Sequence, residues 1–119
     1  MEGFRRSLKT VLLIEDSETL RRFLTDFFSS LNLNVFQASD GEDPTLIVRY
    51  HRGTIDLLLK DVNLGLGSKP ECAIETARRY PRSHILFMSG GLAQEAWDGH
   101  PDKPQGSYFI AKPSRLRRC

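Results

Sequence analysis

Short apolar runs alternate along the chain with segments whose apolar residues recur at helical spacing. Solid runs of strand length are typical of strands that are buried on both faces, as in a parallel sheet. Five runs predict strands: Val11–Ile14, Asn34–Ala38, Ile55–Leu59, Ile85–Met88 and Tyr108–Ala111. Of these, Asn34–Ala38 mixes polar and apolar residues, so we expect it to be an outer strand.

The strongest helix signal lies between the first two runs. Apolar residues recur there at i, i+3, i+4, i+7, i+8 and i+11, which forms one wide apolar stripe. The stripe consists of Leu20, Phe23, Leu24, Phe27, Phe28 and Leu31. It predicts an amphipathic helix, and the hydroxyl of Ser17 is placed to cap the first turn.

Three weaker helical patterns follow. The second helix is expected between Asp40-Gly41 and Gly53, the third from Pro70 to the residue before Pro81, and a short fourth over Leu92–Trp97. The apolar residues that the second and third helices would bury are Leu46, Ile47, Tyr50, Ala73, Ile74 and Ala77. Each helix would therefore connect two of the predicted strands.

The alternation of strands and helices predicts the fold class. It is typical of an α/β fold, a doubly wound open sheet of parallel strands joined by right-handed crossovers. Ligands of such sheets bind outside the carboxyl ends of the strands. The residues that follow each apolar run are therefore the candidates for chemistry.

Polar groups stand at four of these strand ends: Glu15-Asp16, Lys60-Asp61, Ser89-Gly90-Gly91 and Lys112-Pro113. Three carboxylates at one edge repel one another unless a cation lies among them. Carboxylate oxygens suit Mg²⁺, which also takes water and phosphate oxygens as ligands. The hydroxyl and the lysine would hold an added anion. The set indicates phosphoryl transfer to a carboxylate.

Each of these groups alone has a plainer explanation. Asp16 alone would equally well be a helix cap. Ser-Gly-Gly alone would be a turn, and Lys-Pro alone is uninformative. The specific signal is that these groups occur in order, each after a buried strand. Gly65–Pro70 matches neither common phosphate-binding glycine pattern, and we expect a flexible loop there. The histidines have no ligand spacing, and we expect Cys72 to pack in a helix.

The formal net charge of +2 averages two different populations. Residues 1–9 and 112–119 hold seven basic residues and one acidic residue, whereas residues 10–111 hold ten basic and fourteen acidic residues. An acidic body with basic ends does not favour direct binding of nucleic acid.

No apolar run has the length of a membrane span, and no signal peptide is evident. The sparse cysteines suit a reduced, cytoplasmic protein.

Four segments together resemble the receiver domain of two-component response regulators: Val11–Ser17, Asp56–Leu64, Ile85–Gly90 and Phe109–Pro113. The resemblance covers residues 9–114, which leaves 1–8 as an N-terminal extension and 115–119 as a basic C-terminal stub. It implies a flavodoxin-like fold whose parallel strands lie in the order 2-1-3-4-5.

The resemblance also implies roles at the carboxyl edge. Asp61 would accept a phosphoryl group from the phosphohistidine of a partner histidine kinase or phosphotransfer protein. The chain would then catalyse its own phosphorylation and dephosphorylation without being a conventional enzyme. Asp16 and Asp61 would bind Mg²⁺, with Glu15 acting through water and Asn63 supplying a backbone carbonyl.

Three further residues would respond to the phosphoryl group. Ser89 would form a hydrogen bond with it, Lys112 would pair with it, and Phe109 stands where the family has its switch aromatic. The new charge would shift the Ser89–Phe109 face.

The chain departs from the family pattern in several places. Lys60 stands where an apolar or small residue is usual, and we expect it to extend to the edge or to change the potential there. Gly65 replaces a common proline, which loosens the loop. We expect the fourth helix to be short and the fifth to be truncated or missing after Lys112-Pro113. One face of the sheet is then under-covered, and a homodimer need not use the family's usual surface.

Two other functions are open. The first is an interaction module with this fold that does not signal by phosphorylation. The second is a small flavin carrier, which would need a phosphate-binding loop after the first strand, where this chain is acidic. The complete set favours the phosphoacceptor: Glu15, Asp16, Asp61, Ser89 and Lys112.

Overall fold

The computed structural model describes residues 9–39, 44–61, 71–89 and 106–111. Within these ranges the elements are β1 (Thr10–Ile14), α1 (Glu18–Ser30), β2 (Asn34–Ala38), α2 (Pro44–Tyr50), β3 (Leu57–Asp61), α3 (Glu71–Arg79), β4 (His84–Ser89) and β5 (Tyr108–Ala111). All neighbouring strands are parallel, in the order β2-β1-β3-β4-β5. The predicted fold class and strand order are confirmed, and β2 is an outer strand.

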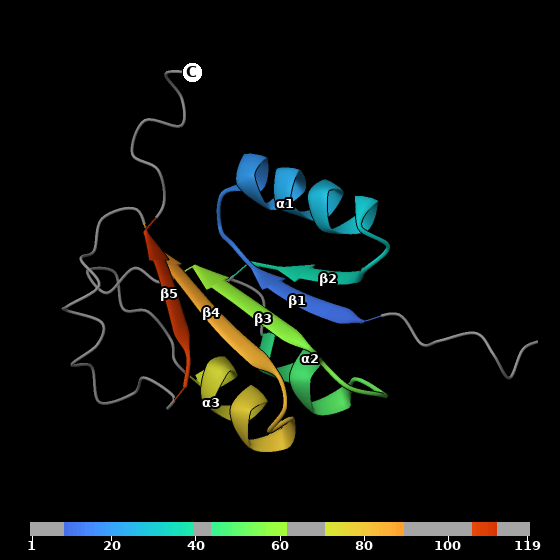
Figure 1. Ribbon diagram of the computed structural model, residues 1–119, viewed down its shortest axis with the longest axis vertical. Coiled ribbons are helices and arrows are strands. Elements are labelled where there is room, and N and C mark those ends of the chain that lie inside the picture. The colour runs from blue at the N-terminus through green and yellow to red at the C-terminus, as the bar shows by residue number, and fades with distance from the viewer. Residues whose placement is uncertain (1–8, 40–43, 62–70, 90–105, 112–119) are drawn as a thin grey trace, which may run out of the picture.

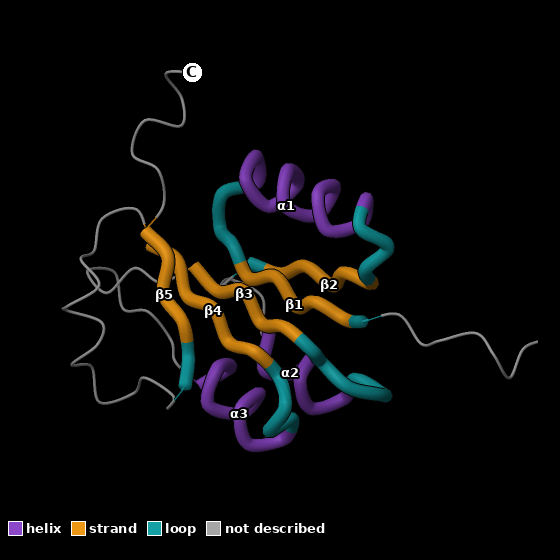
Figure 2. The backbone as a smooth tube through the Cα atoms, viewed as in Figure 1, coloured by secondary structure: helices purple, strands orange, loops and turns teal. Residues whose placement is uncertain are grey.

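The helices cover the two faces of the sheet unequally (Figure 1, Figure 2). α1 lies on one face, whereas α2 and α3 lie side by side on the other. The chain leaves β1 toward β2 on one side and later returns to β3 on the other side of β1. At such a switch point the loops diverge, so the carboxyl edge above β1 and β3 is the place for a ligand.

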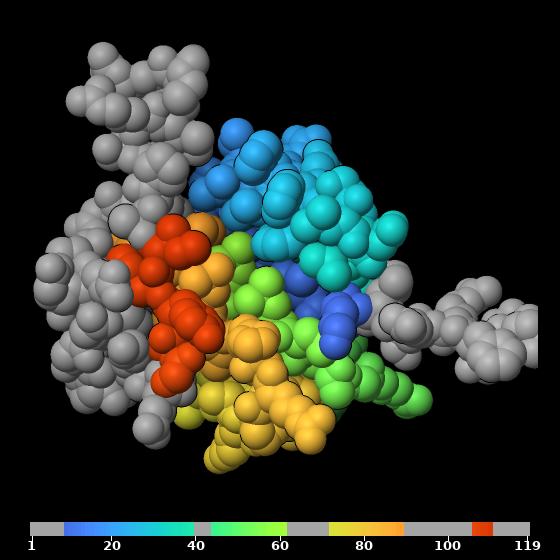
Figure 3. Space-filling view, in the orientation of Figure 1, coloured from blue at the N-terminus to red at the C-terminus, as the bar shows by residue number. Residues whose placement is uncertain are grey.

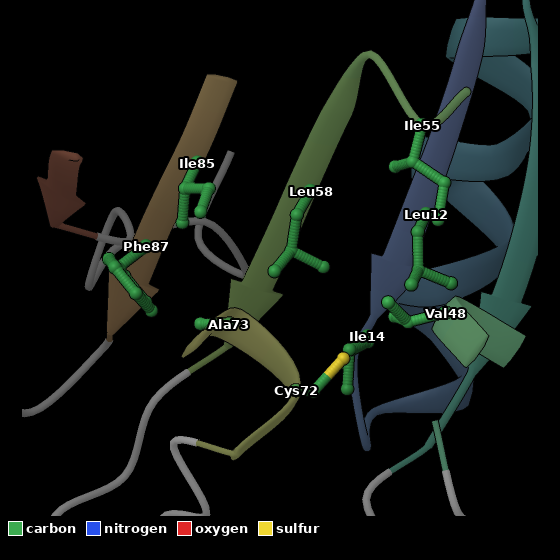
Figure 4. Packing of buried hydrophobic residues seen from close by; sticks show 9 residues of the cluster. All are labelled: Leu12, Ile14, Val48, Ile55, Leu58, Cys72, Ala73, Ile85 and Phe87. Atoms are coloured by element: carbon green, nitrogen blue, oxygen red, sulfur yellow. The ribbon is translucent and has the colours of Figure 1, made fainter. Parts of the chain in front are cut away.

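The main core lies between the sheet and the two helices α2 and α3 (Figure 4). Its buried residues come from β1, β3, β4, the loop before β3 and both helices: Leu12, Ile14, Val48, Ile55, Leu58, Cys72, Ala73, Ile85 and Phe87. None of them is more than 5% exposed. The burial of Cys72 in α3 is as predicted, and the removal of this apolar surface from water is the main force that holds the layers together.

The core beneath α1 is smaller. Its buried residues are Leu13, Leu59 and Met88. The structure describes every residue of α1, and none of them is buried. Among the described residues, this face of the sheet is therefore more thinly covered than the other one.

The apolar stripe of α1 divides into two parts. Leu20, Leu24 and Phe28 pack against the sheet. The other three residues, Phe23, Phe27 and Leu31, are 64%, 49% and 54% exposed. The two sets form neighbouring rows at i, i+4 spacing along the helix, and only the first row faces the sheet.

Some predicted core positions in α2 and α3 are wrong. Leu46 and Tyr50 are 46% and 76% exposed, and Ile74 is 43% exposed. These helices are short and each turns one line of residues to the sheet, so apolar residues beside that line stay in solvent. The predicted positions that do pack against the core are Ile47, Ala73 and Ala77.

The ends of two helices test the capping predictions. The hydroxyl oxygen of Ser17 accepts a hydrogen bond from the backbone N–H of Leu20 at 3.3 Å, so Ser17 caps α1 as predicted. α2 ends at Tyr50, and Gly53 has a φ of 99°. Glycine adopts that conformation without steric cost, so Gly53 turns the chain toward β3 rather than directly ending the helix.

Several predictions fall outside the described residues: the start at Pro70, the loop Gly65–Pro70, the helix Leu92–Trp97 and the segment after Ala111. Among the helices that are described, none has the length and apolar character needed to cross a membrane.

Candidate functional site

The sheet register brings predicted site residues to one edge. In the pair of β1 and β3, Ile14 lies opposite Lys60. Glu15 and Asp61 are thus the next residues on strands that lie about 4.8 Å apart. In the pair of β3 and β4, Asp61 lies opposite the residue before Ser89. The predicted site residues that share this edge are Glu15, Asp16, Asp61 and Ser89.

Hydrogen bonds fix the turn that follows β1. The backbone N–H of Glu15 donates to the carbonyl of Ala38 at 3.0 Å, and its carboxylate Oε2 accepts from the backbone N–H of Ser17 at 3.0 Å. Its carbonyl accepts from the guanidinium of Arg21 at 2.7 Å. Glu15 is only 1% exposed. The buried carboxylate is therefore held in one position, which suits a residue that acts through water.

Arg21 has a role at this edge that the sequence analysis missed. It lies in the second turn of α1 and is half-buried. Its guanidinium reaches back to Glu15 across the start of the helix. A signal was present in its spacing, because a residue four positions after the cap Ser17 lies on the same side of the helix as the cap.

The two carboxylates predicted to bind Mg²⁺ differ in exposure. Asp16 is exposed, and Asp61 is half-buried at the end of β3. In the described ranges, no three His, Cys, Asp or Glu side chains gather closely enough to hold a metal. Mg²⁺ usually binds through one or two carboxylates and keeps several waters. Two carboxylates at an accessible edge therefore fit Mg²⁺ with water as its other ligands. They would not surround a metal ion with protein ligands alone.

Ser89 and Phe109 connect this edge to the main core. Ser89 ends β4 and is 3% exposed. Phe109 of β5 is half-buried, lies opposite Phe87 and packs against the core on the side of α2 and α3. Lys112 and Asn63 lie outside the described residues, so their predicted roles stay predictions.

Lys60 is completely buried, at 0% exposed. It lies between Ile14 and Phe87 on the neighbouring strands. Since side chains alternate along a strand, Lys60 faces the side of α2 and α3 and Asp61 faces the side of α1. Burying an ammonium group is costly unless it is compensated. The sequence indicates this burial because Lys60 directly follows the apolar run Leu57–Leu59 of a buried strand.

Solved structures share this fold. A response regulator receiver protein from Sinorhizobium medicae is 23% identical, with a TM-score of 0.71 over 90% of this chain and 84% of that chain. A structure of the histidine kinase ThkA in complex with the response regulator protein TrrA matches with 16% identity and a TM-score of 0.65, over 92% of this chain and 90% of that chain. No family model matches the chain.

Curated relatives include both long and short proteins. The autoinducer 1 sensor kinase/phosphatase LuxN of Vibrio harveyi is 24% identical over 102 residues, which are 80% of this chain and 12% of LuxN. The chain thus spans only about an eighth of that relative. The response regulator receiver protein CpdR of Brucella abortus is 30% identical over 115 residues, which cover 92% of this chain and 89% of CpdR. With this similarity along nearly the whole of both chains, and with the confirmed strand order, the chain belongs to the family of response regulator receiver domains of two-component systems.

Proposed function

We propose that the chain is a phosphoacceptor receiver in which Asp61 takes a phosphoryl group from the phosphohistidine of a histidine kinase or phosphotransfer protein. The observation that carries this proposal is the register of β1 and β3, which puts Glu15, Asp16 and Asp61 at one edge. A carboxylate acceptor beside two further carboxylates is an arrangement that favours transfer of an anionic group together with a divalent cation.

The proposed transfer forms one bond and breaks one bond. A carboxylate oxygen of Asp61 attacks phosphorus in line with the leaving nitrogen, the P–N bond breaks, and the donor histidine takes up a proton. Attack by water on phosphorus later releases inorganic phosphate and regenerates the carboxylate. The rigid end of β3 positions the attacking oxygen, and positioning supplies much of the catalysis in such reactions.

The remaining site residues would hold the charges. When bound, Mg²⁺ would neutralise charge on the phosphoryl oxygens, with ligands from Asp16, Asp61 and the backbone carbonyl of Asn63. Glu15 would orient metal-bound water from its fixed, buried position. Lys112 would pair with a phosphoryl oxygen. These assignments follow from residue chemistry at matching positions of the family pattern.

The proposed output is a change at Ser89 and Phe109. A phosphoryl group adds about −1.5 to −2 charge at Asp61 and would draw the Ser89 hydroxyl toward it. Phe109 is half-buried and packs against the core, so a movement of the end of β4 would alter its packing. If the packing has two stable arrangements, the added charge would favour one of them and so alter the surface around Phe109.

The partner class is part of the same proposal. A chain in a kinase–regulator complex is among the structural neighbours, and a sensor kinase is among the relatives. We propose residues 9–114 as the receiver unit, with 1–8 as an extension and 115–119 as a stub.

The direct test is covalent modification of Asp61. The chain is incubated with Mg²⁺ and acetyl phosphate, and intact and peptide mass spectrometry follow. We expect the mass of one phosphoryl group on the peptide that contains Asp61, none for Asp61→Asn, and none when EDTA removes Mg²⁺. Fluorescence of the single tryptophan, Trp97, should respond to a beryllium fluoride phosphate mimic.

The alternative is an interaction module that does not signal by phosphorylation, and the exposed Phe23 and Phe27 of α1 favour it. Absence of any phosphoryl group at Asp61, from both acetyl phosphate and a phosphorylated kinase, would exclude the phosphoacceptor. The module would then be the remaining function for this fold.

A further inference from the structure

A second chemical feature lies at the amino edge of the sheet, away from Asp61. A hollow of about 640 Å³ opens there, lined by Lys9, Thr54, Ile55, Asp56, Arg79, Tyr80, Pro81, Arg82, Ser83 and His84. Asp56 precedes β3 and Asp61 ends it, so at about 3.3 Å per residue the two edges are roughly 16 Å apart. The hollow is therefore separate from the phosphoacceptor edge.

Three stretches of chain meet around the hollow: the residue before β1, the residues before β3 and the turn between α3 and β4. In Figure 3 the blue start of β1, the green residues before β3 and the orange residues before β4 adjoin on the visible face. Backbone hydrogen bonds join them, because Asp56 N–H donates to Thr10 at 2.9 Å and His84 N–H donates to Asp56 at 2.9 Å. The walls are thus part of the sheet framework.

Three basic groups around the hollow have no acidic partner among the described residues. In the part of the chain that the structure describes, the side chains of Lys9, Arg82 and His84 form no ion pair. Three other exposed basic residues, Arg22, Arg78 and Arg79, pair with a glutamate. Among the described lining residues, the positive charges of Lys9, Arg79 and Arg82 outnumber the single carboxylate of Asp56, so the lining is net positive.

The lining also contains one acidic group, which has a structural role. Asp56 is the one carboxylate among the described lining residues. Its Oδ2 accepts a hydrogen bond from the backbone N–H of Thr10 at 2.8 Å. Asp56 thus stabilises the start of β1 and does not pair with the three basic groups.

One lining residue has a hydroxyl that forms no hydrogen bond among the described residues. The Oγ of Ser83 is buried and has no hydrogen-bond partner among the described residues. Its backbone N–H is used, because it donates to the carbonyl of Tyr80 at 2.9 Å. A buried hydroxyl without a partner is unfavourable, so a polar ligand that reaches it would recover that loss.

We propose that this hollow binds a small molecule that carries phosphate groups. Guanidinium, ammonium and hydroxyl donors together match the several acceptor oxygens of a phosphate. The volume lies within the range of about 300–1,000 Å³ that ligand pockets of proteins have. Tyr80 and His84 add ring surface, which would accommodate an organic part of the ligand. The site does not depend on phosphorylation of Asp61.

The test is calorimetric titration of the full chain with ATP, pyrophosphate and adenosine in separate experiments with EDTA. Without Mg²⁺ the acceptor edge does not take part. We expect saturable binding of ATP at one site and none of adenosine. Pyrophosphate tests whether the phosphate groups alone supply the affinity. If it binds as tightly as ATP, the site recognises phosphate alone. If it binds more weakly than ATP, the site recognises a larger molecule that carries phosphate.

Matched variants locate the binding. Arg82→Gln and Lys9→Gln remove one exposed charge each and should weaken ATP binding about tenfold. Ser83→Ala should weaken it several-fold. Arg22→Gln on α1 and Arg117→Gln in the stub also remove one charge each, and they should change the affinity less than about twofold. Circular dichroism confirms that each variant folds.

Backbone amide shifts in NMR spectra give the second readout. With ATP, the largest shifts should fall on residues 54–56 and 79–84. The proposal is overturned if ATP does not saturate, if Arg22→Gln or Arg117→Gln weakens binding as much as Arg82→Gln, or if the shifts cluster elsewhere.

Discussion

The two faces of the sheet differ in how they are covered. On the side of α2 and α3 a continuous set of side chains is buried, from Leu12 on β1 to Phe87 on β4. On the side of α1 the buried set is Leu13, Leu59 and Met88. Tyr108 and Ile110, which alternate with Phe109 on β5, are 58% and 51% exposed. One face is a core, and the other is a partly covered surface.

The well-packed face and the face that holds Asp61 are different faces of the sheet. By strand alternation Asp61 shares the side of Leu59, the thinly covered side, whereas Lys60 lies in the well-packed side. A densely packed layer resists movement, while a lightly covered one moves at lower cost. The proposed acceptor Asp61 therefore lies on the side whose cover moves at lower cost, and the opposite face supports the strands beneath the site.

The largest difference between the faces should come from two phenylalanines. Phe87→Ala empties a fully buried site against α3 and should reduce the free energy of unfolding by about 3–5 kcal/mol. Phe23→Ala, at a position that is 64% exposed, should change it by less than about 0.5 kcal/mol. Urea unfolding measures both. If Phe87→Ala does not fold, Phe87→Leu provides a milder change, and equal costs at the two positions would contradict the comparison.

Two adjacent leucines give the closest matched pair. Leu58 lies in the core beside α2 and α3, and Leu59 lies beneath α1. We expect Leu58→Ala to cost about 4 kcal/mol and Leu59→Ala about 2 kcal/mol, because α1 can settle into the space and reduce the cavity. Urea unfolding of the two variants, with the same denaturant slope, gives the difference. A larger cost at Leu59 would mean that the α1 side is the tighter one.

The cap of α1 should matter more than its other exposed hydroxyl contact. Ser17→Ala removes the hydrogen bond to Leu20 and should cost about 1 kcal/mol. The control is Ser30→Ala, whose hydroxyl donates to the carbonyl of Phe27 at the exposed end of the helix, with an expected cost below about 0.5 kcal/mol. Thermal unfolding followed at a helix-sensitive wavelength compares them. Indistinguishable midpoints would show that α1 does not depend on its cap.

The smallest expected effects come from ion pairs on the two faces. On α1, Glu18 and Arg22 lie 3.7 Å apart, with side chains that are 72% and 74% exposed, so Glu18→Gln should cost about 0.3 kcal/mol. On α3, Glu75 pairs with Arg78 and Arg79 and its side chain is 11% exposed. Glu75→Gln should cost about 1 kcal/mol. Added salt at about 1 M should erase the Glu18 effect and leave part of the Glu75 effect, and a complete loss of both would contradict the difference in burial.

Most of the fold was predictable because its signals are local. Solid apolar runs identified four of the described strands, and the mixed run Asn34–Ala38 identified the outer strand β2. The stripe from Leu20 onward together with Ser17 identified α1 and its start. Alternation of strands and helices then brought Glu15, Asp61 and Ser89 to one edge, since carboxyl ends of parallel strands meet there. The candidate site followed from that rule and from the family resemblance.

The errors concern which apolar residues are covered. Phe23, Tyr50 and Ile74 belong to apolar patterns but are exposed. A pattern records the chemistry of a position, and its burial depends on a neighbour from a distant part of the chain. Lys60 is the opposite case, because a charged residue lies where the neighbouring strands leave no route to solvent.

The sequence by itself determined the strands, the main helix and the set of carboxylates and hydroxyls that follows the strands, because these depend on periodicity and order along the chain. The tertiary structure alone decided which face is covered, that Lys60 is buried, and that Lys9, Arg82 and His84 surround one hollow. Those properties arise from residues far apart in sequence, and only packing of the sheet and its helices brings such residues together.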